Sequence, residues 1–240
     1  MHGIKRGTAF LLGVLFSLCV IFILLISSVE IVCYSDPGYF EREYEKYDVL
    51  SNLPEMSMSD EDGLMKVTEH MMDYLRGDED ELQVEVMMGG ELRGFFSDRE
   101  IAHMEDVREL FLGAVFLRRA AFFIAAASAI LIVLILRRKK AVFKALSRGM
   151  LAATAVTALA CAALGLIFAT DFTGAFITFH HIFFDNDLWI LDPRVDMLIN
   201  IVPEGFFFDT AARILILFVG SVLILCLISL AWLRRSKRQK

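Results

Sequence analysis

Four long runs of this chain contain no charged residue, and a run of that length has to be hidden from water. They cover Thr8–Val29, Ala120–Leu136, Gly149–Thr170 and Ile214–Leu233. A helix that crosses the hydrocarbon core of a membrane needs about 20 predominantly apolar residues, within a range of roughly 17–25. The second run is the shortest. Arg118 and Arg119 stand at its start, and their long side chains can reach the lipid headgroups, so this run is still predicted to span the membrane. The pattern predicts a mainly α protein built on a bundle of four transmembrane helices.

The first run could instead be a cleaved signal peptide, because Lys5 and Arg6 give it a basic start. The apolar part of a signal peptide usually has about 7–15 residues, and Thr8–Val29 is longer. Ser27-Ser28-Val29 is the best small-residue cleavage pattern available. The length therefore favours a helix that is retained.

Basic and acidic residues are separated along the chain. All thirty Asp and Glu residues fall within 30–109 and 171–209. The ends of the apolar runs carry basic patches without an acid, made of Lys5, Arg6, Arg137, Arg138, Lys139, Lys140, Lys144, Arg148, Arg234, Arg235, Lys237, Arg238 and Lys240. Cytoplasmic loops of membrane proteins are enriched in Lys and Arg. We therefore expect cytoplasmic termini, acidic segments on the outer side, and basic patches that meet membrane lipids and not nucleic acid.

The charge pattern and the apolar runs divide the chain into five parts. These are 1–32 (cytoplasmic tail and first span), 33–113 (extracytoplasmic cap), 114–172 (second span, basic loop and third span), 173–211 (amphipathic outer-interface segment) and 212–240 (fourth span and basic tail). Cys33 has no second cysteine in the outer segments with which to pair, so we expect no structural disulfide.

The first outer segment has the pattern of a small α+β cap. A helix is predicted from Ser59 to Gly77, with an apolar side that includes Leu64, Val67 and Met71. Residues 82–86 alternate between apolar and polar, Gly89-Gly90 breaks the run, and 91–96 can return as the second strand of a hairpin. Ser97 and Glu100 have capping-box spacing, so a helix begins here and either continues straight into the second span or bends near Gly113.

The second outer segment is rich in Phe, Leu and Ile, which an exposed loop would not tolerate. Asp192-Pro193 predicts the start of a short helix that Pro203 ends, and Asp209 is expected to cap the fourth span. We expect the segment to lie in the outer interface or to fold back over the bundle.

Histidines in the two outer segments are the candidates for chemistry. His103 could meet His180 or His181, with Asp106 or Asp171 nearby to orient a general base. A hydrogen-bonded interfacial histidine is the simpler interpretation. The histidines show no HExxH spacing for zinc, and no G-x-S-x-G nucleophile motif is present, so we expect no metal and no cofactor. A transporter is disfavoured, because no span has an ionisable residue at its centre.

Two stretches resemble a bacterial family of integral membrane lipoprotein intramolecular transacylases. They are residues 96–111 (FSDREIAHMEDVRELF) and 179–207 (FHHIFFDNDLWILDPRVDMLINIVPEGFF). The resemblance implies an acyltransferase that moves the sn-2 acyl chain of a diacylglyceryl lipoprotein onto the α-amine of its N-terminal cysteine, leaving a lyso-form lipoprotein. It implies catalytic roles for His103 in the H-x-x-D-V element and His180 in the F-H-x-x-F-F element. His181, Asp106 and Asp171 would then be supporting residues.

The same resemblance gives expectations for the surroundings of the enzyme. Arg108, Arg118 and Trp189 are candidate contacts to lipid or substrate, and we expect a monomer in a bacterial cell membrane with its active site on the extracytoplasmic side. The alternative is a non-enzymatic sensor or accessory subunit whose cap binds a partner. It is motivated by the 23 Asp and Glu residues between 30 and 109.

Overall fold

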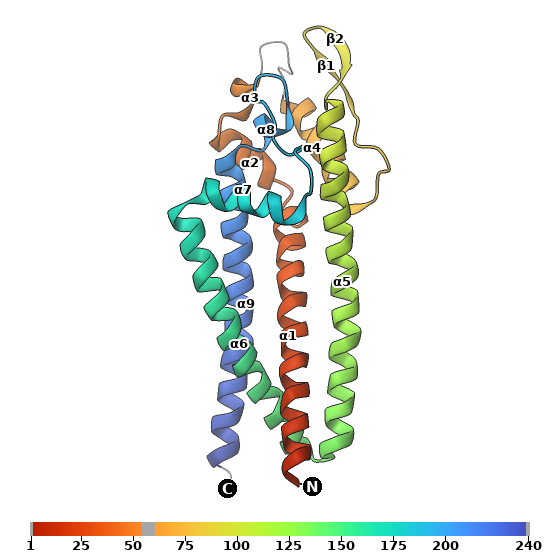
Figure 1. The fold of residues 1–240 in the computed structure, drawn as a ribbon. Helices are drawn as coiled ribbons and strands as arrows, with labels where there is room; N and C mark the ends of the chain where they lie inside the picture. The colour runs from red at the N-terminus through yellow and green to blue at the C-terminus, as the bar shows by residue number, and fades with distance from the viewer. Residues whose placement is uncertain (1, 54–60, 239–240) are drawn as a thin grey trace. The chain divides into compact units, whose positions relative to one another are not determined.

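The computed structural model describes residues 2–53 and 61–238, which are mainly helical (Figure 1). The elements are α1 (His2–Tyr34), α2 (Tyr39–Lys46), α3 (Val49–Asn52), α4 (Glu61–Arg76), β1 (Glu85–Met88), β2 (Glu91–Gly94), α5 (Asp98–Leu136), α6 (Lys139–Thr170), α7 (Phe172–Phe183), α8 (Leu198–Ile201) and α9 (Glu204–Arg238). Within the described residues α1, α5, α6 and α9 are long and apolar enough to cross a membrane. The four-span prediction is confirmed.

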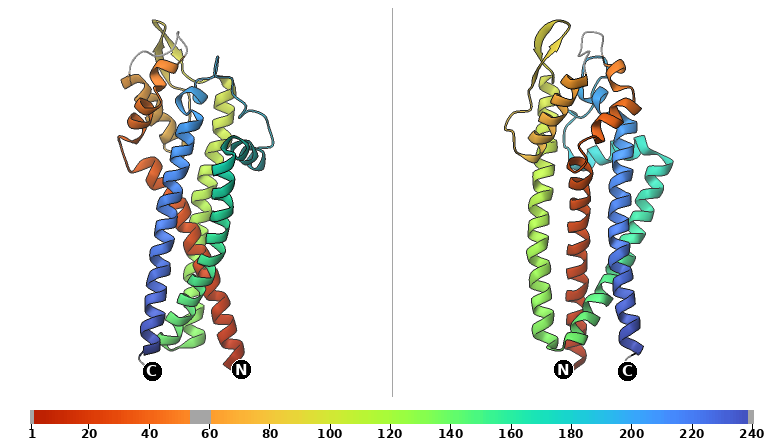
Figure 2. Two further views of the ribbon diagram at one scale, coloured as in Figure 1. Left: turned by 90° about the vertical axis from the view of Figure 1, so that its left-hand side faces the viewer. Right: turned by 180° about the vertical axis from the view of Figure 1, so that it is seen from behind.

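The chain divides into two compact units. The bundle unit consists of Met1–Val32, Val115–Thr170 and Arg213–Lys240, and the α+β unit consists of Cys33–Ala114 and Asp171–Ala212. In the bundle unit the first turn of α1 and the last turn of α9 lie at the same end, as the views in Figures 1 and 2 agree. Which side of the membrane this end occupies stays a prediction.

The bundle unit is held together by close helix packing. A Cβ atom built on Gly149 of α6 would lie 2.2 Å from the carbonyl carbon of Gly13 in α1. One on Gly13 would lie 2.7 Å from the carbonyl oxygen of Ala145. Small residues let transmembrane helices approach this closely, and van der Waals packing then stabilises the pair. An apolar cluster completes the contact, made of Ile21, Met150, Ala153, Phe218 and Val222.

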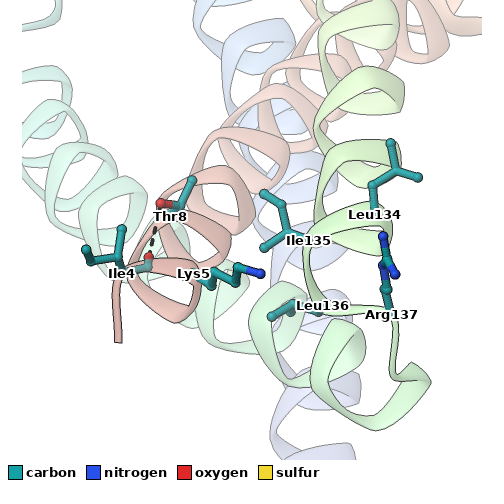
Figure 3. A pocket seen from close by; sticks show the side chains of 7 residues that line it. All are labelled: Ile4, Lys5, Thr8, Leu134, Ile135, Leu136 and Arg137. Carbon is teal, nitrogen blue, oxygen red and sulfur yellow. Dashed lines mark hydrogen bonds between the residues drawn. The ribbon is translucent and has the colours of Figure 1, made fainter. Parts of the chain in front are cut away.

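The connection between α5 and α6 is a tight turn at Arg137. This residue has a φ of +54°, so the helix ends in the left-handed conformation and α6 begins at Lys139. A cavity of about 540 Å³ lies beside the turn (Figure 3). It is lined by Ile4, Lys5, Thr8 and the last residues of α5.

In the α+β unit the predicted helix and hairpin are both present. The start expected at Ser59 lies outside the described residues, as does Lys240, but α4 ends at Arg76 and Gly77 follows it with a φ of +86°. Its apolar side is buried, with Val67 fully enclosed. The strands pair antiparallel, from Glu85 opposite Gly94 to Met88 opposite Glu91. Gly89 and Gly90 both have positive φ, as a two-residue hairpin turn requires.

The capping box that starts α5 is confirmed. The Ser97 backbone N–H donates to Glu100 Oε2 at 2.7 Å, and the Glu100 N–H donates to Ser97 Oγ at 3.3 Å. From there α5 continues without a break in its helical assignment for 39 residues, to Leu136. Glu100 is completely buried and also accepts from the backbone N–H of Leu198, so it links α5 to α8.

Two predicted helix starts are wrong. No helix begins at Asp192-Pro193, because the Asp192 carboxylate bonds to Arg194 and closes a local turn, and α8 starts only at Leu198. The helix does end before Pro203, as predicted. Asp209 does not cap the fourth span, since α9 begins at Glu204 and the Asp209 side chain instead accepts from Lys46 and Tyr47.

Candidate functional site

Helix α7 carries His180 in its last turn and fixes the tautomer of that ring. The helix starts at an N-cap, Asp171, whose carboxylate accepts the N–H of Gly174 at 2.8 Å. Four residues before His180, the carbonyl oxygen of Phe176 lies 2.8 Å from His180 Nδ1. A carbonyl oxygen can only accept, so Nδ1 carries the proton. In the neutral ring Nε2 then keeps its lone pair and can act as a base.

His103 comes from α5 and lies against His180. The two ring centroids are 6.1 Å apart, and both residues are 6% exposed. Phe184 contacts both rings, at 5.3 Å from His103 and 5.6 Å from His180. The Nδ1 atom of His103 is buried and has no hydrogen-bond partner among the described residues. The α+β unit therefore brings together the two histidines that the family resemblance selects.

Trp189 is a further aromatic residue that packs on His180. The two rings are stacked, with centroids 4.7 Å apart and an interplanar angle of 28°. The same indole meets the exposed His181 edge-on at 5.2 Å. Its Nε1 atom is buried without an acceptor in the described part of the chain. His180 thus sits among aromatic rings, with Phe176 completing the group at 4.2 Å.

Burial lowers the pKa of His180 below the ordinary value of 6.5, and the nearby His181 lowers it further. The bond to the Phe176 carbonyl acts in the opposite direction but does not outweigh burial. An apolar surrounding disfavours the charged imidazolium. His180 is therefore neutral near pH 7, which is the state in which a general base works.

Asp106 lies near the pair, at the edge of an open hollow. Its carboxylate accepts a hydrogen bond from Asn186 Nδ2 at 2.8 Å. The hollow has a volume of about 370 Å³ and its wall includes Asp106, Leu110, Phe183 and Phe184. Phe184 lines this hollow and also contacts both histidine rings.

Three other predicted site residues form their hydrogen bonds and ion pairs with groups other than the histidines. Asp171 caps the opposite end of α7. Arg108 donates to the Glu79 carbonyl at 2.9 Å and covers the Tyr74 ring at 4.6 Å. In the bundle unit Arg118 forms an ion pair with Glu30 through two hydrogen bonds, one of them 3.0 Å long.

The sequence analysis did not single out Phe176 and Phe184, which pack on His180 from one turn before and one turn after it. Their spacing of four residues on either side is the signal that could have found them. The described residues contain no group of three or more His, Cys, Asp or Glu placed to hold a metal ion.

Comparison with known proteins adds a family and a fold. The model of the family lipoprotein intramolecular transacylase Lit matches residues 14–207. The structure of Lit from Bacillus cereus is 21% identical in sequence, with a TM-score of 0.74 and 100% of each chain covered. A variant of that protein, with one histidine replaced by arginine, gives a TM-score of 0.69 at 21% identity over 98% of this chain and 96% of the other. None of the curated proteins compared with the chain matches it.

Proposed function

Because this chain belongs to the lipoprotein intramolecular transacylase family, we propose that it transfers the sn-2 acyl chain of a diacylglyceryl lipoprotein to the α-amine of the N-terminal cysteine. Members of this family are acyltransferases. We therefore test an enzymatic activity and set aside the alternative of an accessory subunit. The chain is a multi-pass integral membrane protein. A lipid-linked substrate can reach such an enzyme without leaving the membrane.

The observation that carries the proposal is the buried pair of His103 and His180, with ring centroids 6.1 Å apart. His180 has its Nδ1 proton committed to the Phe176 carbonyl, which leaves Nε2 to receive a proton. His103 has an Nδ1 atom that makes no bond within the described residues. Two neutral imidazoles beside each other can handle both proton transfers of an O-to-N acyl shift.

In the proposed reaction the lone pair of the cysteine amine attacks the carbonyl carbon of the sn-2 ester. Nε2 of His180 takes one proton from the attacking nitrogen, and the tetrahedral intermediate then breaks its bond to the glyceryl oxygen. That oxygen receives a proton from the histidine pair, so an amide and a free hydroxyl form with no net change in protons. An unperturbed α-amine has a pKa of about 7.7–8.0, which makes a neutral base useful near pH 7.

The aromatic surroundings suit a transfer that must avoid hydrolysis. Phe176, Phe184 and Trp189 pack around His180 and limit the access of water to it. Donor and acceptor belong to one substrate molecule, so orientation supplies much of the rate without a covalent enzyme intermediate. Asp106 would support the site from its edge, through Asn186.

The setting of the reaction is part of the same proposal. The positive-inside rule supports cytoplasmic termini and an extracytoplasmic active site in a bacterial cell membrane. The enzyme would work as a monomer in contact with membrane lipids, because both histidines come from one chain.

The test is mass spectrometry of the N-terminal lipopeptide from cells with and without the protein. Expression should convert the diacylglyceryl cysteine into an N-acyl monoacylglyceryl cysteine of the same total mass. His103→Ala and His180→Ala should abolish the conversion while the protein still inserts. An unchanged lipopeptide in the presence of correctly inserted wild type would refute the proposal.

A further inference from the structure

The Nε1 atom of Trp189 is a buried donor that the protein itself does not use. Most buried polar side-chain atoms in proteins have a hydrogen-bond partner, and leaving one unsatisfied destabilises the fold. Trp189 Nε1 and His103 Nδ1 are two such atoms, since neither has a hydrogen-bond partner among the described residues. Both belong to rings that contact His180. These two groups therefore lie where the reaction is proposed to occur.

The chemistry at that place requires a donor other than the N–H of His180. When the amine attacks the ester, the carbonyl oxygen gains negative charge and needs a hydrogen bond that strengthens as the charge develops. The neutral ring of His180 has only one N–H, and that group already donates to the Phe176 carbonyl. A second donor must come from another side chain or from the backbone. An indole N–H is a donor only, and it cannot compete with the histidines for the amine proton.

The stacking geometry makes Trp189 suitable for this role. Its ring lies at 28° to the His180 ring with centroids 4.7 Å apart, so the two ring planes are nearly parallel. The N–H of the indole and the Nε2 lone pair of the imidazole each lie in their ring plane, and both point out of the rim of the stack. The proposed contact therefore places the substrate carbonyl oxygen at the edge of the indole ring and the substrate amine at the edge of the imidazole ring.

We infer that Trp189 is a catalytic residue of the acyl shift, and that its indole N–H donates a hydrogen bond to the sn-2 carbonyl oxygen as the tetrahedral intermediate forms. The inference rests on the proposed function. In the step, the carbon–oxygen π electrons move onto the carbonyl oxygen when the new C–N bond forms, and they return when the C–O bond to glycerol breaks. The indole keeps its proton throughout, so the proton balance of the reaction is unchanged.

The experiment compares purified full-length variants on a synthetic diacylglyceryl lipopeptide, with initial rates measured by mass spectrometry. Trp189→Phe keeps a stacked ring but removes the N–H. Replacement of Trp189 by β-(3-benzothienyl)alanine keeps the bicyclic shape and puts sulfur where the N–H was. Trp232→Phe, in the bundle unit against Phe143, is the matched control. Loss of one oxyanion donor typically lowers kcat by about 10²–10³-fold.

We expect both Trp189 variants to lose about 10²–10³-fold in kcat with KM within threefold of wild type, and Trp232→Phe to keep its rate. A benzothienyl variant as active as wild type would overturn the inference, because shape alone would then be sufficient. If both Trp189 variants were active while His103→Ala and His180→Ala were not, the inference would fail and the proposed function would stand. An inactive wild type would overturn both.

Discussion

Phe176 fixes the ring of His180 across a single helical turn, with 2.8 Å between the Phe176 carbonyl oxygen and His180 Nδ1. Phe176 lies inside α7, one turn before His180, and its carbonyl oxygen has a second lone pair for this bond besides the one used in the helix. The bond decides which nitrogen of the neutral imidazole keeps its lone pair.

The first prediction separates the two nitrogens of His180. His180→Asn keeps a donor near the Nδ1 position, whereas His180→Gln places its amide near the Nε2 position. Both lack a general base, so we expect both to lose about 10²–10⁴-fold in kcat. Asn should keep the bond to Phe176 and with it the melting temperature. A rate within tenfold of wild type for either variant would remove His180 from proton transfer.

The second prediction concerns pH. The pKa of His180 lies below 6.5 in the folded chain, because the ring is buried, and close to 6.5 in the unfolded chain. Between these two values the unfolded chain binds more protons, so the free energy of unfolding falls as the pH is lowered below about 6.5. The contribution of neutral His180 is fully present at pH 7. Thermal unfolding in detergent at pH 7.5 and 5.5 should show a larger loss for wild type than for His180→Gln, and equal losses would contradict the argument.

The third prediction tests the N-cap of α7. Asp171→Ala removes the acceptor for the Gly174 N–H and should lower the free energy of unfolding by about 0.5–2 kcal/mol. Asp171→Asn or Asp171→Ser should keep most of it, because either side chain still offers an oxygen. Kinetics at 20 °C should be little changed, since Asp171 is nine residues from His180 along the helix. A kcat loss as large as that of His180→Asn would instead give the carboxylate a catalytic role.

The fourth prediction concerns the buried carboxylate that joins α5 to α8. Glu100 accepts from the backbone N–H groups of Ser97 and Leu198, and a hydrogen bond to a charged group contributes about 1.5–3 kcal/mol. Glu100→Ala should therefore lower the free energy of unfolding by about 3 kcal/mol or more. Glu100→Gln keeps one acceptor oxygen and should lose less. An unchanged melting temperature in Glu100→Ala would show that the two segments are held by other contacts.

The fifth prediction uses two glycines of the same helix. Gly149→Ala places a methyl group within 2.2 Å of the Gly13 backbone, so α1 and α6 must separate and the melting temperature should fall by several degrees. Gly165→Ala is the control, because a Cβ atom there meets nothing within 4 Å. It should be neutral or stabilise the helix by about 0.5–1 kcal/mol. Equal effects of the two changes would argue against close packing at Gly149.

Sequence patterns predicted the starts, turns and ends of helices and strands correctly where these depend on contacts between residues close in the sequence. The capping box at Ser97, the left-handed turn at Gly89-Gly90 and the end of α4 at Gly77 each depend on residues a few positions apart. The four spans follow from apolar length alone. The pair of His103 and His180 came from the family resemblance, and spacing left His181 as an equal candidate.

The errors occurred where a side chain has a choice of partners. Asp192 has the residue type and the following proline of an N-cap, but Arg194 binds its carboxylate and a turn forms instead. Asp209 precedes a long apolar run, yet Lys46 and Tyr47, from a distant part of the sequence, take its carboxylate. The stack of Trp189 on His180 could not be predicted, because it depends on how a loop folds back, which no periodicity reports.

The α+β unit is assembled from two stretches of the chain. The chain between them forms the part of α5 after Ala114 and the whole of α6. During synthesis the stretch with His103 is made first, and His180 follows only after α6. A nascent chain that has reached Thr170 therefore holds one histidine of the pair and neither Phe184 nor Trp189 around it. The proposed catalytic pair is thus complete only after three of the four spans have been made.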